Sequence, residues 1–143
     1  MAGIYIHIPF CRKACHYCDF HFSTDYSLQN AFITALLKEI ELQRPYLQGE
    51  TVETIYFGGG TPSLLASTAV HQIMNSILNS FRIGSDPEIT FEANPDDIDA
   101  LHLKEWKAAG INRLSMGVQS FFKEDLLWMN RIHDENQAMR AIE

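Results

Sequence analysis

All three cysteines of the chain lie in one short stretch, as Cys11, Cys15 and Cys18. An odd number of thiols cannot form a complete disulfide framework, and disulfides seldom persist in the cytosol. The thiols are therefore better interpreted as metal ligands. A four-iron cluster normally takes four thiolates, so three would leave one iron with an open position. An iron of that kind can bind a substrate or cofactor, which would make the stretch a site of chemistry.

Two other ligand sets compete with an open cluster. A structural zinc would be completed by His16 or His21, although such sites usually have a second ligand pair at a distance, and the sequence has no evident one. Asp19 would close the cluster as a fourth ligand and make it an electron carrier. His102 and His133 are isolated and are expected at the surface. The spacing favours the open cluster and leaves both alternatives standing.

Composition indicates the class of protein that carries this loop. The chain has 143 residues, of which 46% are hydrophobic and 20% charged, enough for one domain with a hydrophobic core. The net charge is −7 and no run of basic residues exceeds two, so nucleic acid is not an expected partner. The N-terminus lacks a signal-peptide pattern, and no stretch approaches the ~20 apolar residues of a membrane span. We expect a cytoplasmic protein.

Strand-like and helix-like segments alternate along the chain. Strands are expected at about 3–8, 53–57, 88–92 and 113–119, and helices at about 28–40, 70–81 and 98–109. Asp97 is the expected N-cap of the third helix and Gly110 its end, while Asp134 would cap a further helix. The alternation predicts an α/β fold of about four βα units with parallel strands. Four units cannot close a barrel that ordinarily takes eight, so a fragment of a longer protein is expected.

Each predicted strand has one apolar face and one polar or small face. In the first, Ile4, Ile6 and Ile8 share one side while Tyr5 and His7 share the other. The polar side continues in the other strands as Tyr56, Gly58, Thr90, Glu92, Ser115, Gly117 and Gln119. A parallel sheet covered on both sides would be apolar throughout. The polar face is therefore expected to line a ligand cavity, as in a barrel or open partial barrel; a half-solvated sheet is the alternative.

A series of motifs spans almost the whole chain. They are Tyr5-Ile-His-Ile-Pro-Phe, the cysteine loop, Gly58-Gly-Gly-Thr-Pro-Ser, Glu92-Ala-Asn-Pro and Gly117-Val-Gln-Ser-Phe. In this order they closely resemble the radical S-adenosylmethionine (radical SAM) enzymes related to oxygen-independent coproporphyrinogen III oxidase. The oxidases have a further cysteine two positions after the third, where this chain has Phe20. The resemblance is therefore to the heme chaperone branch of the family.

The resemblance implies a role for each matching residue. Cys11, Cys15 and Cys18 would bind a [4Fe-4S] cluster, with S-adenosylmethionine (SAM) chelating the fourth iron through its amino and carboxylate groups. The matching cofactor-binding positions are Tyr5, Tyr17, Gly59, Gly60, Thr61, Glu92, Gln119 and Arg131. Backbone amides of the glycine run would approach the methionine end of SAM, because no side chain intervenes.

Three of these positions carry more specific expectations. Glu92 would bind ribose hydroxyls or the ammonium group of SAM. Gln119 and Arg131 match positions that contact a second SAM in the oxidases. The whole chain, residues 1–143, would form an incomplete radical SAM core domain, the N-terminal part of a partial TIM-like barrel, without the C-terminal part of the barrel or a C-terminal domain.

The resemblance also implies a function. The expected activity is that of a heme chaperone, which holds heme as cargo and hands it to respiratory proteins, without coproporphyrinogen oxidase activity. The alternative is the oxidase reaction, in which a 5′-deoxyadenosyl radical starts the oxidative decarboxylation of porphyrinogen propionates. Expected partners are heme, heme-accepting respiratory proteins and an electron donor such as a flavodoxin. Weak membrane association is expected only through such partners.

Overall fold

A sheet of four parallel strands organises the chain in the computed structural model, which describes residues 2–143. The strands β1 (Ala2–Ile8), β2 (Val52–Gly59), β3 (Ile83–Ala93) and β4 (Arg113–Met116) lie side by side in chain order. Between them run the helices α1 (Gln29–Leu42), α2 (Ser67–Ser80) and α3 (Ala100–Ala108), followed by α4 (Lys123–Trp128) and α5 (Glu135–Arg140). The predicted α/β architecture with parallel strands is confirmed.

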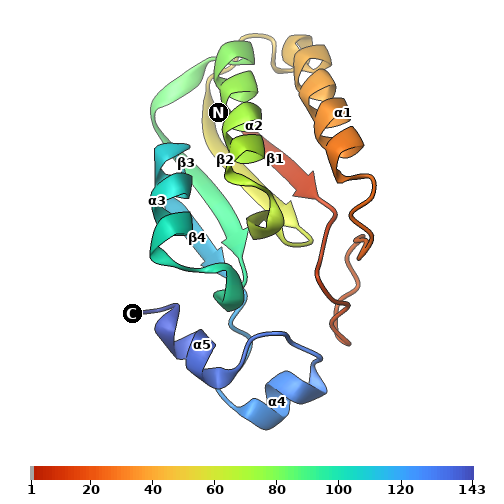
Figure 1. The fold of residues 1–143 in the computed structure, drawn as a ribbon. Helices are drawn as coiled ribbons and strands as arrows, with labels where there is room; N and C mark the ends of the chain where they lie inside the picture. Colours follow the sequence, from red (N-terminus) through yellow and green to blue (C-terminus); the bar gives the residue numbers. More distant parts are fainter. Residues whose placement is uncertain (1) are drawn as a thin grey trace.

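The helices fall into two groups (Figure 1). Helices α1, α2 and α3 cover one face of the sheet, whereas α4 and α5 lie beyond the carboxyl ends of the strands. Short 3₁₀ turns, η1 (Arg44–Leu47), η2 (Pro62–Leu64) and η3 (Pro95–Asp97), complete the connections. Among the described residues, no helix combines the length and apolar character that crossing a bilayer requires.

The hydrophobic core lies between the sheet and the three long helices. Ile55, Phe57 and Phe91 from the central strands are buried there, and the Phe57 and Phe91 rings meet edge to face at 5.5 Å. Trp106 of α3 packs on Phe91 with ring centroids 5.2 Å apart. The apolar stripe of α2 is buried as its periodicity predicted, at Val70, Ile73, Met74 and Ile77. Burial of each large apolar side chain here stabilises the fold by about 1.5–3 kcal/mol. The helices therefore hold the apolar face of the sheet, and its polar face points away from them.

The polar face is presented as the strand alternation predicted. Parallel register places Tyr5 beside Tyr56 and Tyr56 beside Thr90 in one row across the sheet. The Tyr5 side chain is exposed, at 59% of its surface, and the long helices lie on the opposite side (Figure 1). The carboxyl ends of the strands border a cavity. The cavity interpretation therefore holds at the carboxyl ends of the strands, whereas farther along the face Tyr5 is open to solvent and Thr90 is buried.

Several local expectations were wrong. Strand β4 ends at Met116 instead of 119, because the Val118 amide turns back to donate to the Met116 carbonyl at 3.0 Å, and Gln119 follows with φ of +66°. The N-cap of α3 is Asp99, which accepts from the His102 amide at 2.8 Å. Helix α4 was not predicted, since six residues are too few to show a helical period. The C-terminal expectation is confirmed, because Asp134 forms a capping box with Gln137.

The position of His133 also differs from the expectation of a surface residue. It is only 2% exposed, and its Nε2 donates to the carbonyl of Val118 at 2.9 Å. The Nδ1 of the same ring lies 4.0 Å from the Asp96 carboxylate in η3. His133 therefore joins the turn after β4 to the turn after β3.

Candidate functional site

A cavity of about 270 Å³ lies at the carboxyl ends of the strands. The loop after β1, the motifs that follow β2, β3 and β4, and the segment after α4 all contribute to its wall. Every predicted site residue except Tyr5 lines it: Cys11, Cys15, Cys18, Tyr17, Gly59, Gly60, Thr61, Glu92, Gln119 and Arg131. The fold thus brings together residues that lie far apart in the sequence.

The cysteine loop is closed at its base by backbone pairing. The Cys11 amide donates to the Ser23 carbonyl at 3.0 Å, and the Ser23 amide donates to the Pro9 carbonyl at 2.7 Å. The buried Phe10 ring, directly before the loop, packs edge to face on Phe32 of α1 at 5.5 Å. These contacts fix where the loop leaves the core and returns, so the three thiols project from an anchored segment.

The thiols have polar partners from two other segments. Thr61 Oγ1 donates to Cys11 Sγ at 3.5 Å, and Arg131 Nη1 donates to Cys15 Sγ at 3.4 Å. Burial raises the pKa of the Cys11 thiol; the Thr61 hydroxyl opposes this shift, the thiols of Cys18 and Cys15 reinforce it, and the Arg131 guanidinium opposes it. Thiolates are the form that binds metal. An iron centre at this position would supply the positive charge that favours three neighbouring thiolates.

The alternative ligands lie elsewhere. His16 donates to the Trp128 carbonyl at 2.8 Å through its Nδ1, and His21 packs beside the His7 ring. Neither histidine lines the cavity, nor does Asp19. Among the residues that the structure describes, no three His, Cys, Asp or Glu side chains stand at the spacing for a single metal ion. The donor set at the cavity is three thiols without a histidine or carboxylate from the same loop, which fits a cluster with one open iron.

The glycine run has a different local role from the expected one. The Gly60 amide donates to the Ile8 carbonyl at 2.8 Å, and the Thr61 amide donates to the Phe10 carbonyl at 2.7 Å. The Gly59 amide donates to a carboxylate oxygen at the end of β3. These three amides are engaged within the protein. The glycines instead let the end of β2 pass very close to the start of the cysteine loop.

The Glu92 carboxylate is held at the cavity by two donors. The Tyr56 hydroxyl donates to its Oε1 at 2.7 Å, and the Gly59 amide donates to its Oε2 at 3.2 Å. Tyr5 stacks on Tyr56 with ring centroids 6.0 Å apart, and its hydroxyl lies 3.3 Å from His7 Nδ1. Burial, followed by the nearby carboxylate, raises the pKa of both tyrosines. Both hydroxyls therefore stay protonated, and Tyr56 remains a donor to Glu92 at neutral pH.

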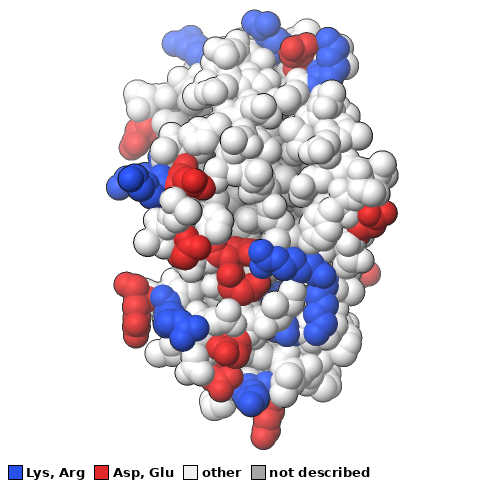
Figure 2. Space-filling view, in the orientation of Figure 1, with Lys and Arg blue, Asp and Glu red and all other residues white. Residues whose placement is uncertain are grey.

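An ion-pair network beside the cavity was not predicted from the sequence. Arg12, inside the cysteine loop, pairs with Asp96 at 2.6 Å and also with Asp97. Ser63, which ends the glycine motif, donates to Asp97 at 2.6 Å. The network ties the loop to the turns after β2 and β3. Figure 2 shows acidic and basic side chains gathered below the uncharged surface of α2. The only sequence signal was that these residues lie within a predicted motif or one to two residues after it.

Comparison with known proteins shows to which family the chain belongs. The profile of the Radical SAM superfamily matches residues 5–143. The chain belongs to this superfamily. In radical SAM proteins generally, an iron-sulfur cluster and SAM are the implied cofactors, and the thiols and polar groups at the cavity are donors of the right chemistry for both. The family that the motifs predicted is thereby confirmed.

Two individual relatives carry names that are more specific than the superfamily. The chain is 40% identical over 141 residues to "Heme chaperone HemW" of Escherichia coli K12, covering 97% of this chain and 37% of that protein. It is 38% identical over 148 residues to the heme chaperone HemW of Bacillus subtilis 168, covering 100% of this chain and 38% of that protein. The radical SAM chain thus spans less than two fifths of the length of these relatives.

A solved structure confirms the fold class. The coproporphyrinogen III oxidase HemN from Escherichia coli, described as a radical SAM enzyme, superposes with a TM-score of 0.89 at 34% identity. The superposition covers 98% of this chain and 33% of that one. The four parallel βα units therefore correspond to part of a TIM-like radical SAM barrel, as the alternation and the motifs predicted.

Proposed function

We propose that this protein is a heme chaperone of the radical SAM type. It would bind a [4Fe-4S] cluster through Cys11, Cys15 and Cys18, bind SAM beside the cluster, and deliver heme to respiratory proteins. The observation that carries the proposal is one cavity lined both by the three thiols and by the Glu92 carboxylate. The heme chaperones among the relatives support the cargo.

Different residues of the cavity would bind the cluster and SAM. The thiolates would hold three irons, and the cluster with SAM would supply one-electron chemistry when both are bound. Each oxygen of Glu92 accepts one hydrogen bond from the protein, and a carboxylate oxygen has capacity for a second. Glu92 is thereby fixed in position and still able to accept from ribose hydroxyls or from an ammonium group.

The alternative function is that of coproporphyrinogen III oxidase. The superposition on the Escherichia coli oxidase favours it. Phe20 opposes it, because this side chain lines the cavity at the place where the oxidases carry a further cysteine. A phenyl ring offers neither a metal ligand nor a proton, whereas it suits contact with an apolar macrocycle. On balance the chaperone is the better supported function.

One pair of assays separates the two functions. The anaerobically reconstituted protein is incubated with coproporphyrinogen III, reductant and SAM, and in parallel with hemin followed by a heme-free acceptor protein. The proposal expects hemin binding and transfer without protoporphyrinogen. Formation of protoporphyrinogen at a catalytic rate would replace the chaperone with the oxidase. Cys15→Ala serves as the control, because it should abolish any product that depends on the cluster.

Other parts of the proposal follow from the same function. A flavodoxin-type electron donor, a cytoplasmic location and weak membrane association through respiratory partners all stay predictions. So does the assignment of residues 1–143 to an incomplete core domain. A pull-down of reduced flavodoxin by the reconstituted protein would test the donor.

A further inference from the structure

Helix α4 ends in a Schellman motif that points the following residues at the cysteine loop. Asn130 comes after the C-cap Met129 with φ of +61°, a left-handed conformation that Asn tolerates better than most residues. Its amide donates to the Leu127 carbonyl at 3.1 Å, and the Arg131 amide donates to the Leu126 carbonyl at 2.9 Å. These are the two hydrogen bonds that define the motif. The reversal brings residues 130 and 131 up against the cavity.

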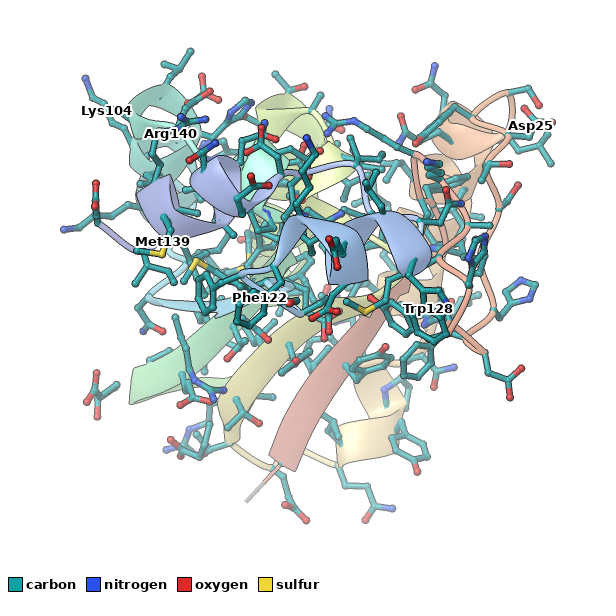
Figure 3. The ribbon with its side chains drawn as sticks, turned by 90° about the horizontal axis from the view of Figure 1, so that it is seen from below. Asp25, Lys104, Phe122, Trp128, Met139 and Arg140 are labelled. Atoms are coloured by element: carbon teal, nitrogen blue, oxygen red, sulfur yellow. The ribbon has the colours of Figure 1, made fainter. Side chains whose placement is uncertain are left out.

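The end of α4 holds the backbone of the cysteine loop directly. The His16 amide donates to the Met129 carbonyl at 3.2 Å, and His16 Nδ1 donates to the Trp128 carbonyl at 2.8 Å. The Asn130 side-chain amide donates to the Ala14 carbonyl at 2.7 Å. Figure 3 shows Trp128, at the end of α4, beside the segment of chain that carries the loop. Two carbonyls of the helix end and one side chain thus support residues 14–16.

Arg131 extends this support to the thiols and to two further motifs. Its Nη1 donates to Cys15 Sγ at 3.4 Å and to the Tyr17 hydroxyl at 3.3 Å. Its Nη2 donates to Asn94 Oδ1 at 2.7 Å and to the Gly117 carbonyl at 2.8 Å. The two terminal nitrogens carry four N–H groups, and all four have acceptors within the protein. The fifth N–H group, on Nε, has no partner but is buried. No donor of this guanidinium is therefore both free and exposed to the carboxylate of a second SAM, the role that the family resemblance implied.

We propose that Arg131, presented by the Schellman turn of α4, is a positioning residue for the cysteine loop and a hydrogen-bond donor to Cys15, in place of a cofactor contact. The guanidinium holds Cys15 in a fixed relation to the ends of β3 and β4. The part of the proposal that concerns the cluster rests on the proposed function. There, an N–H donor to a ligating sulfur stabilises the more negative, reduced cluster and raises its reduction potential.

Hydrogen exchange of the cofactor-free protein tests the positioning role without any cluster. Arg131→Ala should raise the exchange rates of amides in residues 11–18 by about tenfold or more, while the amides of β2 and α2 keep their protection. Arg131→Lys should not restore protection, because one ammonium group cannot reach four acceptors. Asn130→Gly keeps the left-handed turn but loses the bond to Ala14, so an intermediate increase is expected.

The control is Arg113→Ala, which removes an arginine at the start of β4 that is bonded to Glu88 and Thr90 in the middle of β3. It should leave exchange in the loop unchanged. Circular dichroism shows whether each variant is folded; if Arg131→Ala is not, Arg131→Lys and Asn130→Gly provide the comparison. Unchanged loop exchange in Arg131→Ala, or full protection in Arg131→Lys, would overturn the positioning role.

The reconstituted protein supplies the second readout. Arg131→Ala should shift the reduction potential of the cluster to a more negative value and leave the affinity for SAM within about twofold of the native protein. Weaker SAM binding with unaltered potential and loop exchange would make Arg131 a cofactor ligand and refute the inference. If the native protein assembles no cluster, the proposed function fails, whereas the exchange measurement still decides whether Arg131 positions the loop.

Discussion

Gly60→Ala should loosen the cysteine loop from the sheet. A Cβ at this position would lie 2.7 Å from the Phe10 carbonyl oxygen, 2.8 Å from the Ile8 carbonyl oxygen and 2.9 Å from the Phe10 amide nitrogen. All three are backbone atoms, which cannot rotate away as a side chain would. The end of β2 must therefore move, and the hydrogen bonds from Gly60 to Ile8 and from Thr61 to Phe10 cross the same contact.

The expected loss can be worked from these contacts. Overpacking of this kind costs about 1–3 kcal/mol, and each weakened hydrogen bond about 1 kcal/mol. The overlap can be relieved only by stretching those hydrogen bonds, so the cost of overpacking and the cost of the weakened bonds partly replace each other and do not simply add. We therefore expect a loss of about 3 kcal/mol in the free energy of unfolding. For a domain of this size that corresponds to about 10 °C in Tm.

Urea denaturation, followed by circular dichroism, measures this loss. Gly49→Ala is the matched control, because Gly49 has φ of +82° but no atom within 4 Å of the place that a Cβ would take. That variant should lose only the cost of left-handed backbone, about 1–2 kcal/mol. Equal losses in the two variants, or a Gly60→Ala protein within about 0.5 kcal/mol of the native one, would show that the close approach does not hold the loop.

Three further predictions concern the segments around the site. Burial lowers the pKa of His133 below 6.5, so stability is full above that value and falls as pH drops through the folded-state pKa; His133→Gln should flatten the acid limb of stability measured against pH. Asp134→Ala removes the capping box of α5 and should cost about 1 kcal/mol in urea denaturation. Arg12→Ala breaks the pairs with Asp96 and Asp97, so limited proteolysis should cut the cysteine loop faster, and Tm should fall because two buried carboxylates lose their cation.

The sequence was most informative where polar or reactive residues recur at the spacing of a strand or follow a strand in an ordered motif. Alternation in the strands predicted which side chains of β1 to β4 face away from the helices, because side chains of a strand alternate by geometry alone. The cysteine spacing and the ordered motifs predicted which loops meet at the cavity, since parallel strands end at the same edge of a sheet. Of the predicted site residues, Tyr5 is the one that lies outside the cavity wall, where it stacks on Tyr56.

Tertiary partners were beyond the reach of the sequence. Whether the amides of Gly60 and Thr61 face a ligand depends on which carbonyls lie opposite, and those belong to Ile8 and Phe10, far earlier in the chain. Burial of His133 depends on α5 packing against the turn after β3. Helix α4 is too short for a period, so the Schellman turn that directs Arg131 at the cysteine loop had no local signal beyond an Asn before an Arg.

We propose that three thiolates hold a cluster with one iron left for SAM. Electron-nuclear double resonance of the reduced, reconstituted protein, with SAM labelled isotopically at its amino nitrogen, tests it most directly. We expect a hyperfine coupling between the label and the cluster, and we expect it to be absent in Cys15→Ala. A cluster signal without coupling to the label would contradict the open iron, and a colourless zinc protein would contradict the cluster itself.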